Sequence, residues 1–164
     1  MHGQNRGKGK NETRARRNRA WREIEKIVGP GLFDLPAFFK NGLYRLHRGG
    51  LTDAEIVRAF ERCHAWVART MENGLGECEC GCGTKHPVGA VNGQGQSVWC
   101  LDHDPSKKAF RGILHQRCNM ELGDGNRQRK WAHVNFIEAH ETRLPEEAAL
   151  VRDRDEFQAT GAVD

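Results

Sequence analysis

The sequence predicts a small α+β fold in which helices flank a short β-hairpin region. Three observations lead to this prediction. Apolar residues recur at helical spacing in the first half of the chain, short apolar runs separated by glycine-rich turns follow from residue 88, and three cysteines lie close together between these two parts. At 164 residues the chain can form one domain with a modest core, and its 19 glycines predict many turns.

Two helices are expected near the N-terminus. Within residues 14–28, Trp21 and Ile24 fall on one helical face, and the Gly-Pro-Gly sequence at 29–31 ends the run. A second, short helix is expected over residues 35–46. The N-terminal half is therefore predicted to be helical.

A third helix is predicted from a capping box at residues 52–55, where threonine is followed three positions later by glutamate. The helix should continue to about Met71. Its apolar positions, at spacings of three or four, are Ile56, Phe60, Cys63 and Val67. We assign Phe60 and Trp66 to packing, and we interpret Cys63 as a packed thiol on this helix.

The second half of the chain is expected to contain strands and turns. Residues 88–91 and 97–101 look like strands on either side of a turn at 92–96, which predicts a hairpin and places Cys100 in a strand. The remaining expected elements are a strand over residues 109–114, a helix that begins near 116–119 and ends before 123, and a final helix over 127–141.

The net charge of +4 conceals an asymmetry between the two ends of the chain. Residues 1–20 contain seven basic residues and one acidic residue, a net +6, and are expected to form a disordered basic arm suited to phosphate groups. Residues 144–164 contain six acidic residues and two arginines, a net −4, and are interpreted as a solubilising tail. No apolar run approaches the roughly 20 residues that cross a bilayer, so we expect a cytoplasmic protein without a membrane partner.

The six cysteines favour metal ligation over disulfides, because no apolar export signal precedes them and three lie within residues 78–82. Structural zinc takes four cysteine or histidine ligands, usually as two close pairs. One pair is His115 with Cys118, and the knuckle at 78–82 must supply the other. We favour a three-residue spacer, which lets the chain wrap the ion. The predicted Zn²⁺ ligands are Cys78, Cys82, His115 and Cys118, with Cys80 as an alternative in the knuckle.

A second group of residues suits hydrolysis of a phosphodiester. A nuclease needs a base to activate water and a cation to stabilise the transition state. His103 can be the base, and Asp102 with the Asn119 side-chain oxygen can hold Mg²⁺. Adjacent strand residues point to opposite faces, so Asp102 and His103 can share a site only where the strand bends or ends. The turn-prone residues 104–106 provide such a bend.

Four short motifs carry this chemistry: Leu101-Asp102-His103-Asp104, Arg111-Gly112-Ile113-Leu114, Cys118-Asn119 and Leu122-Gly123. Their order and spacing after a cysteine knuckle resemble the recombination endonuclease VII family of phages, within the HNH, His-Me finger or ββα-metal nucleases. The resemblance covers residues 77–123, between a quarter and a third of the chain.

The resemblance implies a zinc-stapled ββα-metal core flanked by α-helices and an activity that hydrolyses DNA with one Mg²⁺ or Mn²⁺. It implies that His103 is the general base, that Asp102 and Asn119 bind the catalytic cation, and that the zinc is structural. DNA phosphates would be contacted by Lys107, Lys108 and Arg111.

Three features depart from the family pattern. His115 stands where the family usually has cysteine, the first knuckle contains three cysteines instead of a simple pair, and Pro105 stands where many members have a second histidine. The competing interpretation is a non-catalytic zinc-containing module that binds nucleic acid. A junction-resolving enzyme would need paired sites and hence a homodimer, for which the helices at 52–71 and 127–141 are candidate interfaces.

The expected organisation has five parts. They are a basic disordered arm (1–20), a helical N-terminal region (21–73), the zinc-bound nuclease core (74–126), a C-terminal helix (127–143) and an acidic tail (144–164).

Overall fold

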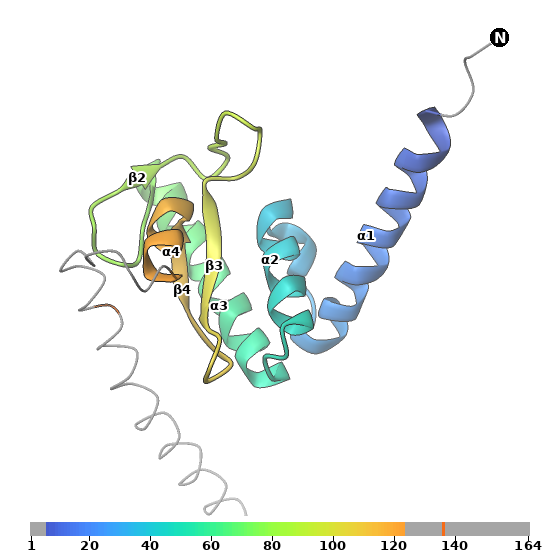
Figure 1. Cartoon of the computed structure of the whole chain (residues 1–164), viewed down its shortest axis with the longest axis horizontal. Helices are drawn as coiled ribbons and strands as arrows, with labels where there is room; N and C mark the ends of the chain where they lie inside the picture. The colour runs from blue at the N-terminus through green and yellow to red at the C-terminus, as the bar shows by residue number, and fades with distance from the viewer. Residues whose placement is uncertain (1–5, 124–135, 137–164) are drawn as a thin grey trace, which may run out of the picture.

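A computed structural model describes residues 6–123 and Phe136. The predicted C-terminal helix, apart from Phe136, and the acidic tail lie outside the described residues. The elements, in chain order, are α1 (Arg6–Val28), the 3₁₀ turn η1 (Leu32–Asp34), α2 (Ala37–Arg48), α3 (Asp53–Asn73), β1 (Gly76–Glu77), β2 (Lys85–His86), β3 (Trp99–Asp104), β4 (Ala109–His115) and α4 (Gln116–Gly123) (Figure 1). The described part is thus a small α+β fold.

The helix α1 begins at Arg6, well before the predicted start at residue 14. Most of the segment expected to be a disordered arm is therefore helical, which corrects that prediction. The segment has no proline before residue 30, and it is rich in arginine and lysine, which favour helix. Trp21 and Ile24 anchor the C-terminal half of α1 in the core, as predicted.

The predicted capping box at the start of α3 is confirmed in part. The Thr52 hydroxyl accepts a hydrogen bond from the Glu55 backbone N–H at 3.3 Å. The Glu55 carboxylate, however, does not return to Thr52. It accepts from the Phe110 backbone N–H at 2.6 Å and pairs with Arg58, so it links α3 to β4.

The hairpin of the structure differs from the predicted one. β3 pairs with β4 in antiparallel fashion. The predicted turn at 92–96 is present, with Val91 paired to Ser97 in a single bridge and the Val98 N–H donating to the Ala90 carbonyl at 3.0 Å, but the pairing extends no farther along residues 88–91. The short run at 88–91 has only that one bridge, while the apolar residues of β4 are buried against α3. The strand predicted at 109–114 is confirmed.

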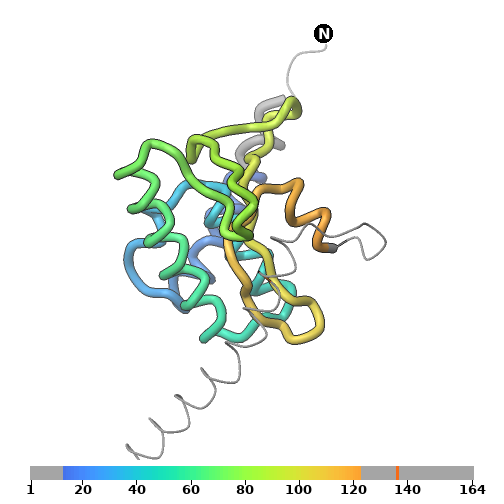
Figure 2. Tube along the Cα trace, turned by 90° about the vertical axis from the view of Figure 1, so that its left-hand side faces the viewer, coloured from blue at the N-terminus to red at the C-terminus, as the bar shows by residue number. Residues whose placement is uncertain are grey.

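The core lies between α2, α3 and one face of this hairpin. Trp66 of α3 is at its centre, with its ring 5.6 Å from that of Phe39 and 4.9 Å from that of Trp99. Its indole N–H donates to the Glu77 carbonyl at 2.9 Å. In Figure 2, α3 and α4 lie on opposite sides of the β3–β4 hairpin.

The predicted packing roles of Phe60, Cys63 and Trp66 are confirmed, because all three side chains are buried. None of the described helices combines the length and the apolar character needed to cross a membrane.

Gly76 is predicted to be essential for this packing, because a Cβ at this position would overlap the Trp66 ring, which is itself held by its aromatic neighbours. Gly76→Ala should lower the free energy of unfolding by about 1–3 kcal/mol. The matched control is Gly89→Ala, where nothing lies within 4 Å of the added Cβ, and its effect should stay within about 1 kcal/mol. Equal losses in the two variants, measured by denaturant titration, would contradict this packing.

Candidate metal centre and the β3–β4–α4 site

Four cysteine side chains converge at the junction between the knuckle and α4. The sulfur atoms of Cys78, Cys80, Cys82 and Cys118 all lie within 4.8 Å of one another. Tetrahedral zinc with bonds of about 2.3 Å places its sulfur ligands about 3.8 Å apart. The distances of 3.3 Å between Cys78 and Cys80 and of 3.5 Å between Cys82 and Cys118 are close to this value. The group can therefore hold a metal ion and fits structural zinc.

The knuckle brings its three thiols together because glycines separate and follow them. Gly81 and Gly83 have φ angles of 79° and 77°, a left-handed conformation that glycine adopts without strain. The β1–β2 pairing and the hydrogen bond from the Cys78 N–H to the Thr84 carbonyl, at 3.0 Å, close the loop. The alternating cysteines thus face one point.

His115 lies outside this group, which corrects its predicted role as a zinc ligand. Its backbone N–H donates to the Cys78 sulfur at 3.2 Å, and its Nδ1 accepts from the Arg117 N–H at 3.3 Å. The His115 ring stacks on His86, with ring centroids 5.1 Å apart. Cys80 completes the set because the glycine turns allow the knuckle to supply three thiols instead of two.

The thiols have very different affinities for protons. The Cys80 thiol hydrogen-bonds to Cys78 and lowers the pKa of Cys78 to about 5, and the same contact raises the pKa of Cys80. Burial raises the pKa of Cys118 to about 12. Ionisation of Cys80 and Cys118 is therefore unfavourable unless a positive charge lies among the sulfurs. Zn²⁺ would supply that charge, and its binding would release protons.

Asp102 is buried in β3 and forms a bidentate ion pair with Arg111 of β4. The Arg111 Nε lies 2.7 Å from Asp102 Oδ2, and its second nitrogen lies 3.0 Å from Oδ1. Burial raises the pKa of Asp102, while the guanidinium acts in the opposite direction. A carboxylate accepts about four hydrogen bonds, so the pair leaves acceptor positions open for a cation.

The strand register changes at the pair Asp102 and His103. Asp102 is opposite Gly112, whereas His103 is opposite Phe110, so Arg111 is an extra residue in β4. A bulge of this kind interrupts the alternation of side chains. The bend that would bring Asp102 and His103 together was expected at the turn that follows β3; the structure instead places the register change of the hairpin opposite these two residues, with the extra residue in β4.

His103 and Asn119 are both half-buried. The backbone N–H of His103 hydrogen-bonds to the Asp102 carboxylate and acts to lower its pKa. Asn119 directly follows the cluster residue Cys118 on α4, and α4 contacts both strands of the hairpin. The thiol cluster therefore fixes the helix that carries Asn119 against the strand that carries Asp102.

The predicted phosphate-contacting residues have other partners in the structure. Arg111 is bound to Asp102, and the Lys108 ammonium donates to the Gly49 carbonyl at 2.9 Å. The exposed Lys107 donates its backbone N–H to the Asp104 carboxylate, which also accepts from Ser106. These bonds, chiefly the one from the Ser106 hydroxyl, lower the pKa of Asp104 to about 2. Asp104 thus stabilises the turn between β3 and β4.

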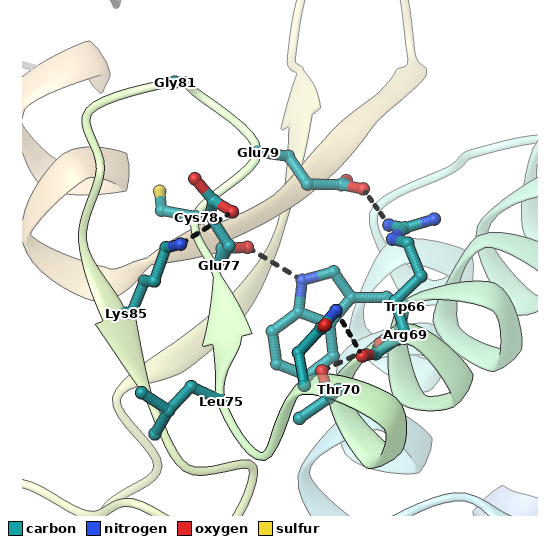
Figure 3. A pocket seen from close by; sticks show the side chains of 10 residues that line it. Trp66, Arg69, Thr70, Leu75, Glu77, Cys78, Glu79, Gly81 and Lys85 are labelled. Atoms are coloured by element: carbon teal, nitrogen blue, oxygen red, sulfur yellow. Dashed lines mark hydrogen bonds and ion pairs between the residues drawn. The ribbon is translucent and has the colours of Figure 1, made fainter.

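Glu79 is a site residue that no sequence motif predicted. Its Oε1 pairs with Arg62 at 2.8 Å and Arg69 at 3.1 Å, and its Oε2 accepts from the Ile113 N–H at 2.9 Å. Its own backbone N–H donates to the Ile113 carbonyl at 3.0 Å. Figure 3 shows Glu79 directed from the knuckle toward Arg69 on α3. One residue therefore joins the knuckle to both α3 and β4.

A cleft of about 600 Å³ lies beside the knuckle, between α3 and the β1–β2 segment (Figure 3). Its cationic groups are paired with carboxylates, Arg69 with Glu79 and Lys85 with Glu77 at 3.5 Å. The cleft therefore presents no unpaired cation to an anionic ligand among its described lining residues.

The chain matches no model of a known protein family, and comparison with curated proteins and with solved structures also found no significant match. The observations on the residues themselves therefore carry the functional argument.

The thiol cluster predicts that the protein binds one equivalent of zinc. Cys80→Ser and Cys118→Ser should each lose the bound metal, because each removes one of four ligands. Removing the metal with a chelator should lower the melting temperature, since binding energy is folding energy at such a site. The measurement is metal content per chain by mass spectrometry of the desalted protein.

The matched controls are His115→Gln and Cys100→Ser. Both positions lie close to the cluster in sequence or in space but outside the four-thiol group, so both variants should retain zinc. Loss of zinc from His115→Gln together with its retention in Cys80→Ser would restore the original ligand prediction and contradict the structure.

Proposed function

We propose that this chain is a metal-dependent DNA endonuclease that hydrolyses phosphodiester bonds. The observation that carries the proposal is the arrangement of β3, β4 and α4. Asp102 and His103 lie at the register change of β3, and Asn119 lies on a helix that contacts both strands. A base, a buried carboxylate and an amide oxygen are the groups that such a hydrolysis requires.

His103 is proposed as the general base that removes a proton from the attacking water. Its backbone position is fixed by the pairing of β3 with β4, and its side chain is half-buried, so water can reach it. The neighbouring Asp102 carboxylate is held in one orientation by Arg111. The Asp102 carboxylate is thus held rigidly, while the His103 side chain remains accessible to water.

Asp102 and Asn119 are proposed to hold the catalytic Mg²⁺ or Mn²⁺. When bound, the cation would stabilise the negative charge of the phosphorane and of the leaving oxygen. Arg111 favours the ionised form of the Asp102 carboxylate, against the effect of burial, and leaves acceptor positions open. Asn119 contributes a neutral oxygen, which suits a hard cation.

The resemblance to the endonuclease VII family supports this reading and suggests a 5′-phosphate product. The form of DNA that is cut is set by regions outside the hairpin. A nicking enzyme can act as a monomer, whereas resolution of a junction requires two sites. A non-catalytic zinc-containing module would bind DNA without any dependence on Mg²⁺ and would cut none of these substrates.

The test is incubation of the full, zinc-loaded chain with plasmid, linear duplex and four-way junction DNA, with Mg²⁺ or with no divalent cation added. We expect cleavage of at least one substrate in Mg²⁺. His103→Ala should reduce that cleavage by at least about a hundredfold, the typical contribution of a general base, while zinc content and melting temperature stay unchanged.

Added imidazole should restore part of the lost activity to His103→Ala, because it replaces the missing base without altering the fold. Undiminished cleavage by the variant would reject His103 as the base. Absence of cleavage by the unmodified chain on all three substrates would favour the non-catalytic module.

A further inference from the structure

A second feature lies on the other side of α2 from the hairpin. α1 and α2 border a groove of about 390 Å³. Each helix contributes residues spaced by three or four positions, so the groove follows one face of each. The basic residues that line it are Arg16 and Arg17 of α1 and Arg45 and Arg48 of α2.

The groove is strongly positive. Its described lining contains four arginines and no acidic residue, and all four arginines are exposed. Among the described residues none of the four has an ion pair. The arginines of the other elements do: Arg58, Arg62, Arg69, Arg111 and Arg117 each pair with a carboxylate. The groove therefore concentrates positive charge that no ion pair of the described residues offsets.

The helices that carry these arginines are held in place. The Trp21 indole N–H donates to the Asn41 side-chain oxygen at 3.0 Å and so ties α1 to α2. Lys40 lies over the Trp21 ring, 4.5 Å from its centre, and adds positive charge at the same junction. Burial and the nearby charge of Arg17 lower the pKa of Lys40. An anion in the groove would reduce the electrostatic repulsion between Arg17 and Lys40.

The groove is also close to the candidate catalytic strand. α2 lies between α1 and β3 in Figure 1 and contacts both. The contact with β3 is tight, because a Cβ added at Gly42 would lie 2.9 Å from the Leu101 side chain. One helix, about 10 Å across, thus separates the groove from the hairpin, a distance of about three base pairs of duplex DNA.

We propose that the α1–α2 groove binds the sugar–phosphate backbone of duplex DNA. This inference rests on the proposed function for the identity of the polyanion. Arginine guanidinium groups match phosphate oxygens in geometry, and the Tyr44 hydroxyl at the groove is a further donor. Duplex DNA carries one negative charge per roughly 1.7 Å of its axis. The acidic segment 144–164, with net −4 over its length, is a far more dilute polyanion and serves as the competing occupant.

The test measures binding of the full, zinc-loaded chain to a 30-base-pair duplex by fluorescence anisotropy across a salt series, with neither Mg²⁺ nor Mn²⁺ added, so that no cleavage occurs and the zinc is kept. Two paired variants remove the groove charge, Arg16→Gln with Arg17→Gln and Arg45→Gln with Arg48→Gln. Each should weaken binding roughly tenfold and reduce the slope of log K against log salt by about two, since each lost phosphate contact removes about 0.9.

The matched control removes the same charge from α1 outside the groove, through Arg22→Gln with Lys26→Gln, two exposed residues that do not line it. It should leave the slope nearly unchanged. Equal losses in the control and the groove variants, or no loss in the groove variants, would overturn the proposal. A peptide of residues 144–164 provides a further test. If the groove variants weaken binding of this peptide but leave DNA binding unchanged, the groove belongs to that segment and the proposal is overturned.

The two proposals can fail separately. Groove-dependent DNA binding by a chain that cuts no substrate would retain the groove and reject the nuclease. Cleavage by a chain whose DNA binding ignores the groove variants would retain the nuclease and reject the groove.

Discussion

The rest of the site depends on the convergence of four thiols from two distant segments. Cys78, Cys80 and Cys82 come from the knuckle, and Cys118 comes from α4, with all sulfur atoms within 4.8 Å. α4 follows β4 without a linker, and this contact restricts the direction in which α4 leaves the hairpin. Since Asn119 is the next residue after Cys118, the same contact sets its position. An ion at the cluster would therefore stabilise the fold and, without touching substrate, the geometry of the proposed catalytic centre.

Three carboxylates connect the remaining elements: two link the knuckle and the hairpin to α3, and the third acts within the hairpin. Glu79 connects the knuckle to α3 and β4, and Glu55 connects α3 to the N–H of Phe110 farther along the same strand. The backbone groups on the outer edge of β4 are thus partly used, which leaves less of that edge open to another strand. The ion pair between Asp102 and Arg111 links β3 to β4 within the hairpin. Partly or fully buried carboxylates that each accept from two or more donors thus recur in this fold.

The elements with strong local signals could be predicted from sequence, and those decided by tertiary packing could not. The capping box located α3, and apolar spacing located the buried residues of α3 and the strand β4. The predicted pairing of residues 97–101 with residues 88–91 did not identify β4 as the main partner of β3. Residues 88–91 resemble a strand locally, but the burial of β4 against α3 decides the pairing. His115 was predicted as a ligand and the knuckle was expected to supply only two thiols, because pair spacing cannot reveal that glycines at positive φ let three alternating thiols face one point. Glu79 carries no motif, and its role depends on partners distant in sequence. The roles of Asp102, His103 and Asn119 in catalysis stay predictions.

The central claim is that two ions serve two purposes in adjacent places, one holding the fold and one acting in hydrolysis. Anomalous diffraction from crystals of the full chain, grown with zinc and soaked in Mn²⁺, tests it most directly. We expect a zinc peak among the sulfurs of Cys78, Cys80, Cys82 and Cys118, and a separate manganese peak between Asp102 and Asn119. A zinc peak coordinated by His115, or manganese absent from Asp102 and Asn119 at saturating concentration, would contradict the account.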